Sequence, residues 1–246
     1  MRLEGKKAIV TGGASGFGAG IVRKFAAEGA KVMIADLNMT LAEEIAAEVD
    51  GLALKTDVSS NDSVSHLADV ASTLLGPVDI LVNNAGITHL PKLMQDVSEE
   101  EFDRVMAVNC KSVYLTARHF APAMIKAGRG AILNIASTAG LSPRPKLNWY
   151  NASKGWMVTA TKTMAVELAP SGVRVNALCP VAGETPLLKS FMGEDTPEMR
   201  AKFLSTIPIG RFSTPEDMGN AACFLCSDEA GMVTGVAMEV DGGRCI

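Results

Sequence analysis

Short apolar runs alternate with segments of helical periodicity along almost the whole chain. Apolar, β-branched runs indicate strands, and apolar positions three and four residues apart indicate amphipathic helices. The predicted strands are Lys7–Thr11, Lys31–Asp36, Gly51–Thr56, Val78–Val82, Ala131–Ser137, Val173–Leu178 and Val236–Val240. The predicted helices lie in residues 21–26, 41–49, 64–75, 98–113 and 150–169 and after residue 214. Because strand and helix alternate, the pattern predicts an α/β fold with a parallel sheet and right-handed crossovers.

No shift in composition, tandem repeat or low-complexity tract divides residues 1–246, so we expect a single domain. The least regular stretch is 183–206, where Pro186, Gly193 and Pro197 interrupt any periodicity. A long segment of this kind beside strand ends is typical of a substrate lid. We therefore predict that residues 183–206 form a lid within the domain.

Composition and charge narrow the classes of function. Of the 246 residues, 48% are hydrophobic and 20% are charged, as in ordinary globular proteins. The formal net charge of -4 provides no basic field for nucleic acid or for an anionic membrane. The charged start of the chain lacks the apolar core of a signal peptide, and no apolar run reaches membrane-spanning length. We therefore expect a cytoplasmic protein that acts on small molecules.

The five cysteines are odd in number and scattered, and only Cys223 and Cys226 have the spacing of a metal or redox pair. That pair lies in an apolar helical pattern with no second pair and no nearby histidine. We expect buried, reduced thiols and no metal site.

A glycine-rich turn, residues 12–18, joins the first predicted strand to the first predicted helix. Glycines let the backbone come close to a pyrophosphate, whose charge is met by amides at the helix N-terminus. The order of strand, turn and helix therefore predicts a dinucleotide site, with a bare tight turn as the alternative.

Asp36 ends the second predicted strand about twenty residues beyond the glycines, where an acid can accept hydrogen bonds from both adenosine ribose hydroxyls. A carboxylate there would repel a 2′-phosphate. No Arg or Lys lies in the glycine-rich turn or directly after Asp36. These features predict NAD, rather than NADP, as the cofactor.

Polar side chains also follow or precede the later strands. Asn83-Asn84-Ala85-Gly86 follows the fourth strand and suits a backbone that lies against a ligand, although a plain turn would use the same residues. Asn109 lies inside a predicted helix, where its amide competes with the backbone, so it is either tolerated or specifically used. Ser137 places a hydroxyl at the carboxyl end of the fifth strand.

Tyr150 and Lys154 are four residues apart in a predicted helix and therefore share one face. A phenol has a reference pKa of about 10, and a nearby cation favours the phenolate, so the pair suits proton transfer nearer neutrality. An exposed amphipathic helix surface would show the same spacing.

Together these motifs resemble the compact, single-domain branch of the short-chain dehydrogenase/reductases over essentially the whole chain. The residues that carry the resemblance are Thr11-Gly12-Gly13-Ala14-Ser15-Gly16-Phe17-Gly18, Asn83-Asn84-Ala85-Gly86, Asn109, Ser137 and Tyr150-Asn151-Ala152-Ser153-Lys154. The resemblance implies a Rossmann-type, doubly wound, seven-stranded parallel sheet with helices on both faces, often in a homotetramer. It also implies reversible hydride transfer between NAD(H) and a secondary alcohol or ketone.

The resemblance further implies a role for four residues. Tyr150 would be the general acid–base, and Ser137 would hold the reacting oxygen. Lys154 would lower the pKa of Tyr150 and bind the nicotinamide ribose. Asn109 would hold a water that links Lys154 to solvent.

The cofactor contacts implied by the resemblance come from most of these motifs. They are Gly12, Ser15, Gly16, Phe17, Gly18, Asp36, Asp57, Val58, Asn84, Gly86, Tyr150, Lys154 and Thr185. Among them, Asp57 and Val58 would contact the adenine, and Thr185 would meet the carboxamide or phosphate end of the cofactor.

The sequence departs from the family pattern after the sixth strand, where the family usually has Pro-Gly. Here Pro180 is followed by Val181, and a glycine occurs only at Gly183. Because valine does not readily adopt a positive φ, we expect the loop to follow another path and to alter the substrate pocket.

Two alternatives to this function stay open. The first is a 3-oxoacyl-[acyl-carrier-protein] reductase, an activity that usually draws on NADPH, which Asp36 opposes. The second is a non-catalytic NAD-binding protein, because a fold does not fix a function. Within the leading interpretation, Arg144, Lys146 and Lys189 either attract an anionic substrate or are solvated surface charges.

Overall fold

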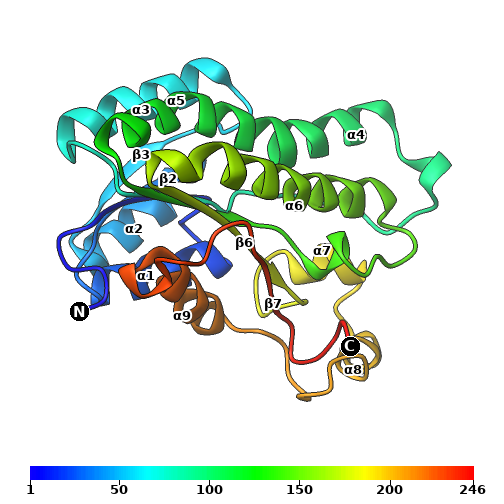
Figure 1. Cartoon of the computed structure of the whole chain (residues 1–246). Coiled ribbons are helices and arrows are strands. Elements are labelled where there is room, and N and C mark those ends of the chain that lie inside the picture. Colours follow the sequence, from blue (N-terminus) through cyan, green and yellow to red (C-terminus); the bar gives the residue numbers. More distant parts are fainter.

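Seven parallel strands form one sheet in the computed structural model, which describes residues 1–246 (Figure 1). The strands are β1 (Lys7–Thr11), β2 (Lys31–Asp36), β3 (Leu52–Lys55), β4 (Ile80–Asn83), β5 (Gly130–Ile135), β6 (Val173–Pro180) and β7 (Ala237–Val240). Their order across the sheet is β3-β2-β1-β4-β5-β6-β7, and every neighbouring pair is parallel. The α/β class and the doubly wound parallel sheet are therefore confirmed.

Helices cover both faces of the sheet. The α-helices are α1 (Gly16–Ala27), α2 (Met39–Val49), α3 (Asn61–Leu74), α4 (Glu99–Met106), α5 (Ser112–Ala127), α6 (Asn148–Leu168), α7 (Leu188–Met192), α8 (Pro197–Leu204) and α9 (Pro215–Cys226). The π-turn η2 (Ala107–Lys111) joins α4 to α5, and the shorter 3-10 turns are η1 (Met94–Asp96), η3 (Thr138–Gly140), η4 (Ala169–Ser171) and η5 (Asp228–Ala230). No helix is both long enough and apolar enough to cross a membrane.

The core has two layers because strand side chains point alternately to the two faces of the sheet. Ala8 and Val10 of β1 pack with α1, α2 and α9 on one face, and Ile9 packs with α3, α5 and α6 on the other. In Figure 1, α1, α2 and α9 lie below the sheet, and α3, α5 and α6 lie above it. Burial on both faces explains why the strands read as continuous apolar runs.

The strand order reverses between β1 and β4, which places the ends of these two strands side by side at a crevice. Asn84, just beyond β4, bridges the gap with its amide, which donates to the carbonyls of Thr11 (3.0 Å) and Gly12 (2.8 Å). The Asn84 side chain thus fixes the start of the glycine-rich turn against the end of β4.

A buried polar chain fastens α6 to the sheet. The Asn83 amide donates to Asn134 on β5 (2.8 Å), and the Asn134 amide donates to Thr161 on α6 (2.8 Å). Thr116 on α5 donates to the other end of the Asn83 amide (2.8 Å). Because unsatisfied groups at such depth are costly, this chain fixes how α6 sits on the strands.

The stretch 183–206, which shows no periodicity in the sequence, contains the short helices α7 and α8. Thr196 caps α8 through its side chain, which accepts from the Met199 N–H (3.2 Å). Val181 packs with apolar residues of α7 and of the chain after α8, so a small apolar cluster anchors the segment. Its action as a lid stays a prediction.

Candidate active site

The glycine-rich turn follows β1 and leads into α1. Gly12 and Gly16 have φ values of +61° and +51°, which residues other than glycine rarely adopt. A Cβ on Gly18 would overlap the Gly12 carbonyl oxygen, so a glycine is needed there for close packing. Ser15, the N-cap of α1, makes no side-chain capping bond, which leaves the first amides of α1 available to an anion.

Asp36 stands at the end of β2 beside this turn. One of its carboxylate oxygens accepts from the Ala14 N–H (3.0 Å), and the other accepts from the Asn38 N–H (3.0 Å). These two bonds fix the carboxylate in place, and each oxygen keeps a lone pair for a ligand hydroxyl.

Tyr150 and Lys154 lie in the first two turns of α6 and are almost completely buried, at 4% exposure each. Burial raises the pKa of Tyr150 to about 12 and lowers the pKa of Lys154 to about 8, because it disfavours both charged forms. At neutral pH, therefore, the phenol keeps its proton and the amine is an ammonium.

The expected lowering of the Tyr150 pKa by Lys154 is not seen in this structure. The ammonium nitrogen lies 5.9 Å from the centre of the Tyr150 ring and donates to the Ile135 carbonyl at the end of β5 (2.7 Å). Desolvation of the phenol raises the pKa of Tyr150, the Lys154 charge is not among the causes of the shift, and only the contact with the Ser137 side chain lowers the pKa.

Ser137 lies two residues beyond β5 and begins the turn η3. Its hydroxyl oxygen accepts from the Ala139 N–H (3.1 Å), so its own proton remains free to donate. The Ser137 hydroxyl and the Tyr150 phenol can therefore meet the same substrate oxygen.

Asn109 lies in the π-turn η2, a type of irregularity that often marks functional sites. Its side-chain oxygen accepts from the Ile87 N–H (2.9 Å), and its amide donates to Ile87 and to the hydroxyl of Ser153 on α6. A Cβ on Gly86 would lie 3.3 Å from the Lys154 ammonium and 3.5 Å from the Asn109 oxygen. Asn109, Gly86 and Lys154 therefore meet at one point.

These residues surround one cavity of about 380 Å³. Of the residues predicted from the sequence, it is lined by Gly12, Ser15, Gly16, Phe17, Asp36, Asn84, Gly86, Ser137, Tyr150, Lys154 and Thr185. Gly18 and Asn109 lie directly behind this lining and pack against it. Asp57 and Val58 lie outside it, and the Asp57 carboxylate accepts from Ser59. The adenine contacts of Asp57 and Val58 stay predictions.

The departure at Val181 is accommodated without strain. Val181 does not have a positive φ, and its side chain is buried at 7% exposure among apolar residues. Gly183 is needed for a different reason, because a Cβ there would overlap the Phe17 ring. The ring of Phe17 and the backbone at Gly183 thus close one wall of the cavity.

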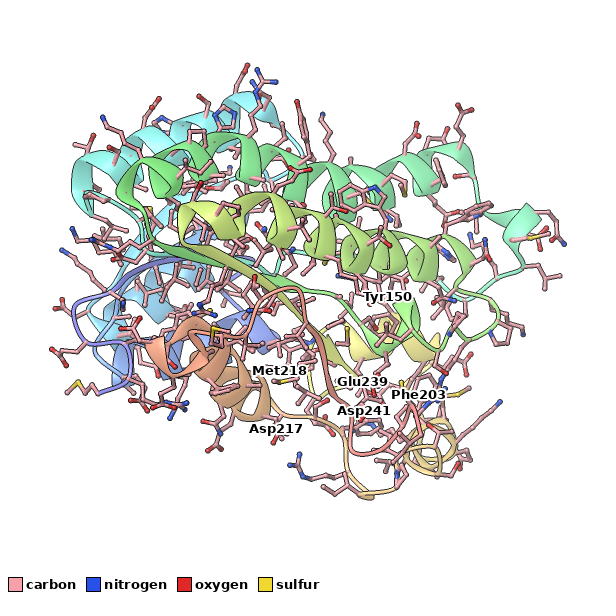
Figure 2. All side chains as sticks on the ribbon, in the orientation of Figure 1. Tyr150, Phe203, Asp217, Met218, Glu239 and Asp241 are labelled. Carbon is pink, nitrogen blue, oxygen red and sulfur yellow. The ribbon has the colours of Figure 1, made fainter.

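The structure adds lining residues that are absent from the predicted catalytic and cofactor sets, including Arg144, whose role the sequence left open. Arg144, Asn151, Phe191 and Phe203 line the cavity on the side of Tyr150. The rings of Tyr150 and Phe191 are in edge contact with centroids 5.1 Å apart. Figure 2 shows Tyr150 on α6 and Phe203 on α8, two helices that are far apart in the sequence. Position in a motif could have pointed only to Asn151, which follows Tyr150.

Four of the five cysteines are buried, as predicted, and Cys245 is partly exposed, so the prediction is wrong for that residue. Cys110 and Cys179 lie near the Lys154 ammonium, and burial raises the pKa of Cys110 to about 11 and that of Cys179 to about 12. Both remain thiols at neutral pH.

The cavity fits a nicotinamide dinucleotide. The amides of α1 and the glycine cradle suit a pyrophosphate, and Asp36 at the end of β2 suits a ribose diol. Tyr150 and Lys154 line the same cavity, where they would meet the reactive ring of such a molecule. The donors and acceptors present therefore match the group.

Comparisons with known proteins agree with this geometry. Residues 12–244 match the family model described as enoyl-(acyl carrier protein) reductase. The chain is 48% identical to 4-formylbenzenesulfonate dehydrogenase of Comamonas testosteroni and 40% identical to 3-oxoacyl-[acyl-carrier-protein] reductase of Thermotoga maritima, with 100% of each chain covered. A crystal structure of 3-ketoacyl-(acyl-carrier-protein) reductase from Brucella melitensis complexed with NADH is 50% identical, with a TM-score of 0.95. That match covers 99% of this chain and 100% of the other.

Replacement of Gly18 tests the cofactor cradle. Gly18→Ala should weaken the binding of NADH and NADPH by about tenfold or more, since displacing the turn costs about 1.4 kcal/mol or more. Quenching of protein fluorescence during titration with each nucleotide measures the effect. Gly155→Ala is the matched control, because its Cβ would meet only the Gly140 oxygen, at 3.6 Å. Equal affinity in the two variants would remove the turn from the cofactor site.

Proposed function

This chain belongs to the short-chain dehydrogenase/reductase family, and from that premise we propose that it reversibly transfers hydride between NAD(H) and a secondary alcohol or ketone. The observation that carries the proposal is the placement of the Ser137 hydroxyl and the Tyr150 phenol beside the buried Lys154 in one cavity. That cavity also contains the glycine-rich turn and Asp36. A proton donor and a nicotinamide site thus share one space.

In the direction of reduction, Ser137 donates a hydrogen bond to the substrate carbonyl oxygen and fixes its position. Tyr150 gives its proton to the same oxygen as negative charge develops there, which is general acid catalysis. The bound cofactor supplies the hydride to the carbonyl carbon. In the direction of oxidation, the Tyr150 phenolate takes the proton from the alcohol.

Lys154 acts through its charge and its donors. An ammonium in a buried site stabilises the phenolate that Tyr150 becomes after it has given up its proton. Its hydrogen bond to Ile135 uses one of three N–H groups, which leaves two for the cofactor ribose. Asn109 keeps Ile87 and Ser153 in place around this ammonium, and we propose that a water beside Asn109 connects Lys154 to solvent.

The preference for NAD over NADP rests on Asp36. Its carboxylate is held at the edge of the cavity by the amides of Ala14 and Asn38, and a 2′-phosphate there would face a fixed negative charge. The Brucella melitensis structure, described as a complex with NADH, supports the same choice.

A second candidate is a 3-oxoacyl-[acyl-carrier-protein] reductase. The descriptions of the Thermotoga maritima relative and of the Brucella melitensis structure favour it. Reduction of a 3-oxoacyl thioester at a rate well above that of simple ketones would support this candidate.

A non-catalytic NAD-binding role is the weakest alternative, because all four predicted catalytic residue types are present. Assembly as a homotetramer remains a proposal that rests on the family resemblance, and a cytoplasmic location remains one that rests on the cysteine pattern.

Removal of the phenol hydroxyl tests the proton-transfer role. Tyr150→Phe should lower kcat by about a thousandfold, in the range of general acid catalysis, while NADH still binds. NADH oxidation followed at 340 nm with a panel of ketones measures turnover. Tyr114 is the other tyrosine, it lies exposed on α5, and Tyr114→Phe should be fully active. A fully active Tyr150→Phe variant would exclude the role.

Removal of the Asp36 carboxylate tests cofactor choice. Asp36→Ala should narrow the ratio of kcat/KM for NAD over NADP by about tenfold to a hundredfold, because charge-assisted hydrogen bonds to the ribose are lost. Asp69→Ala, at an exposed position on α3, is the control and should leave the ratio unchanged. A ratio unchanged in Asp36→Ala would remove Asp36 from the ribose site.

Titration of Lys154 should appear in the pH profile of ketone reduction. The pKa of Lys154 is lowered to about 8, so the ammonium is present below that pH and is lost as the pH rises through it. Reduction should therefore decline above pH 8 in the wild type. Lys154→Arg stays charged, so its rate of reduction should show no such decline. Lys154→Met should reduce ketones slowly, at a rate that does not change with pH near 8. A decline near pH 8 in all three proteins would assign it to another group.

A further inference from the structure

Arg144 is a cation that the chain leaves without an anion. Its side chain lines the cavity, and its guanidinium donates to the hydroxyl of Thr206 (2.6 Å) and stacks over the ring of Phe203 at 5.2 Å. Nine ion pairs occur in the structure, and Arg144 takes part in none of them. A planar guanidinium with spare donors suits a carboxylate, which it binds through two parallel hydrogen bonds.

A second arginine, Arg244, lies close enough to Arg144 for its positive charge to act on it. Arg244 belongs to the C-terminal segment, which packs against residues 207–209 through Gly242, whose carbonyl accepts from the Ile209 N–H (3.1 Å). The Nε atom of Arg244 is buried and has no hydrogen-bond partner, and Arg244 also makes no ion pair.

No carboxylate in the structure pairs with the positive charge of Arg144. Its pKa is lowered by burial and by the positive charge of Arg244, and the Cys245 thiol is the one group that opposes this shift. No carboxylate contributes to the shift. Glu239 and Asp241 lie beside Cys245 but form no ion pair with either arginine, so Arg144 is free to pair with an anion in the cavity.

Apolar side chains form much of the cavity wall on the side of Arg144 and Tyr150. Leu147, Phe191 and Phe203 line the cavity on this side, and Phe191 touches the Tyr150 ring. A substrate that lies along this wall therefore has its carbonyl at Tyr150, an apolar or aromatic body, and its far end at Arg144.

We propose that Arg144, supported by Arg244, binds a carboxylate of the substrate and thereby selects ketones and alcohols with an apolar body and an anionic far end. The proposal rests on the function proposed above and names its substrate class. Lys146 and Lys189 are exposed and do not line the cavity, so they do not belong to this site.

Matched neutral and anionic ketones test the proposal. Reduction of 3- and 4-acetylbenzoate by NADH is compared with reduction of 3- and 4-acetylbenzamide, which have the same shape without the charge. The wild type should favour at least one acid by about tenfold or more in kcat/KM, the range of a charge-assisted pair. Arg144→Gln should abolish this preference, so that kcat/KM for the acids falls to the level of the amides.

Three further variants separate the site from general charge effects. Lys146→Gln removes the same charge two residues away and should keep the full preference. Arg144→Lys should keep part of it, because a lysine presents the charge without the fork. Arg244→Gln should lower it by about threefold, since the supporting charge is lost. Thermal unfolding and NADH titration show whether each variant is folded, and Arg244→Gln still tests the site if Arg144→Gln is not.

A binding measurement distinguishes failure of this inference from failure of the proposed function. Calorimetric titration of the NAD-saturated protein with each acetylbenzoate and acetylbenzamide requires no turnover. Tighter binding of an acid that is lost in Arg144→Gln supports the anion site even if no ketone is reduced. Amides that bind and react as well as the acids, or a preference that survives in Arg144→Gln, would overturn the inference and leave the dehydrogenase function intact.

Discussion

The burial of an ammonium group next to a phenol is the constraint on which the site depends. Lys154 is 4% exposed, and burial lowers its pKa to about 8, so the charge survives at neutral pH only with fixed partners. One partner is the Ile135 carbonyl at the end of β5. Lys154 reaches that carbonyl only because α6 is fixed on the sheet by the buried chain of hydrogen bonds from Asn83 through Asn134 to Thr161. Chemistry and fold are thus joined at one hydrogen bond.

Charge is distributed along the cavity in a way that orients its ligands. Three charged groups line it, namely the carboxylate of Asp36, the buried ammonium of Lys154 and the guanidinium of Arg144. In the proposed function, a nucleotide would place its ribose at Asp36 and extend toward Lys154, and an anionic substrate would bind at Arg144. The opposite charges of Asp36 and Arg144 would then favour a single arrangement of the two reactants.

Much of the fold could be predicted because both faces of the interior strands are buried, so that each strand appears in the sequence as a continuous apolar run. The ends of the elements are harder to predict from the sequence. The pattern predicts Ser137 as the last residue of a strand, but Ser137 is the N-cap of the turn η3, and the predicted helix around Asn109 is interrupted by a π-turn. The Ser137 side chain bonds locally, to the Ala139 N–H, whereas the Asn109 side chain bonds to the distant backbone of Ile87, a contact that leaves no periodic signal in the sequence.

The sequence by itself determined the residue types and the order of the cofactor turn, Asp36, Asn109, Ser137, Tyr150 and Lys154, because each belongs to a local motif of fixed spacing. Only the tertiary structure decided which charges face the cavity. Arg144 and Lys146 are two residues apart in one irregular loop, yet Arg144 lines the cavity beneath Phe203, whereas Lys146 is exposed. In a loop without periodicity, the direction of a side chain depends on contacts with α8 and the C-terminal segment, which local sequence does not encode.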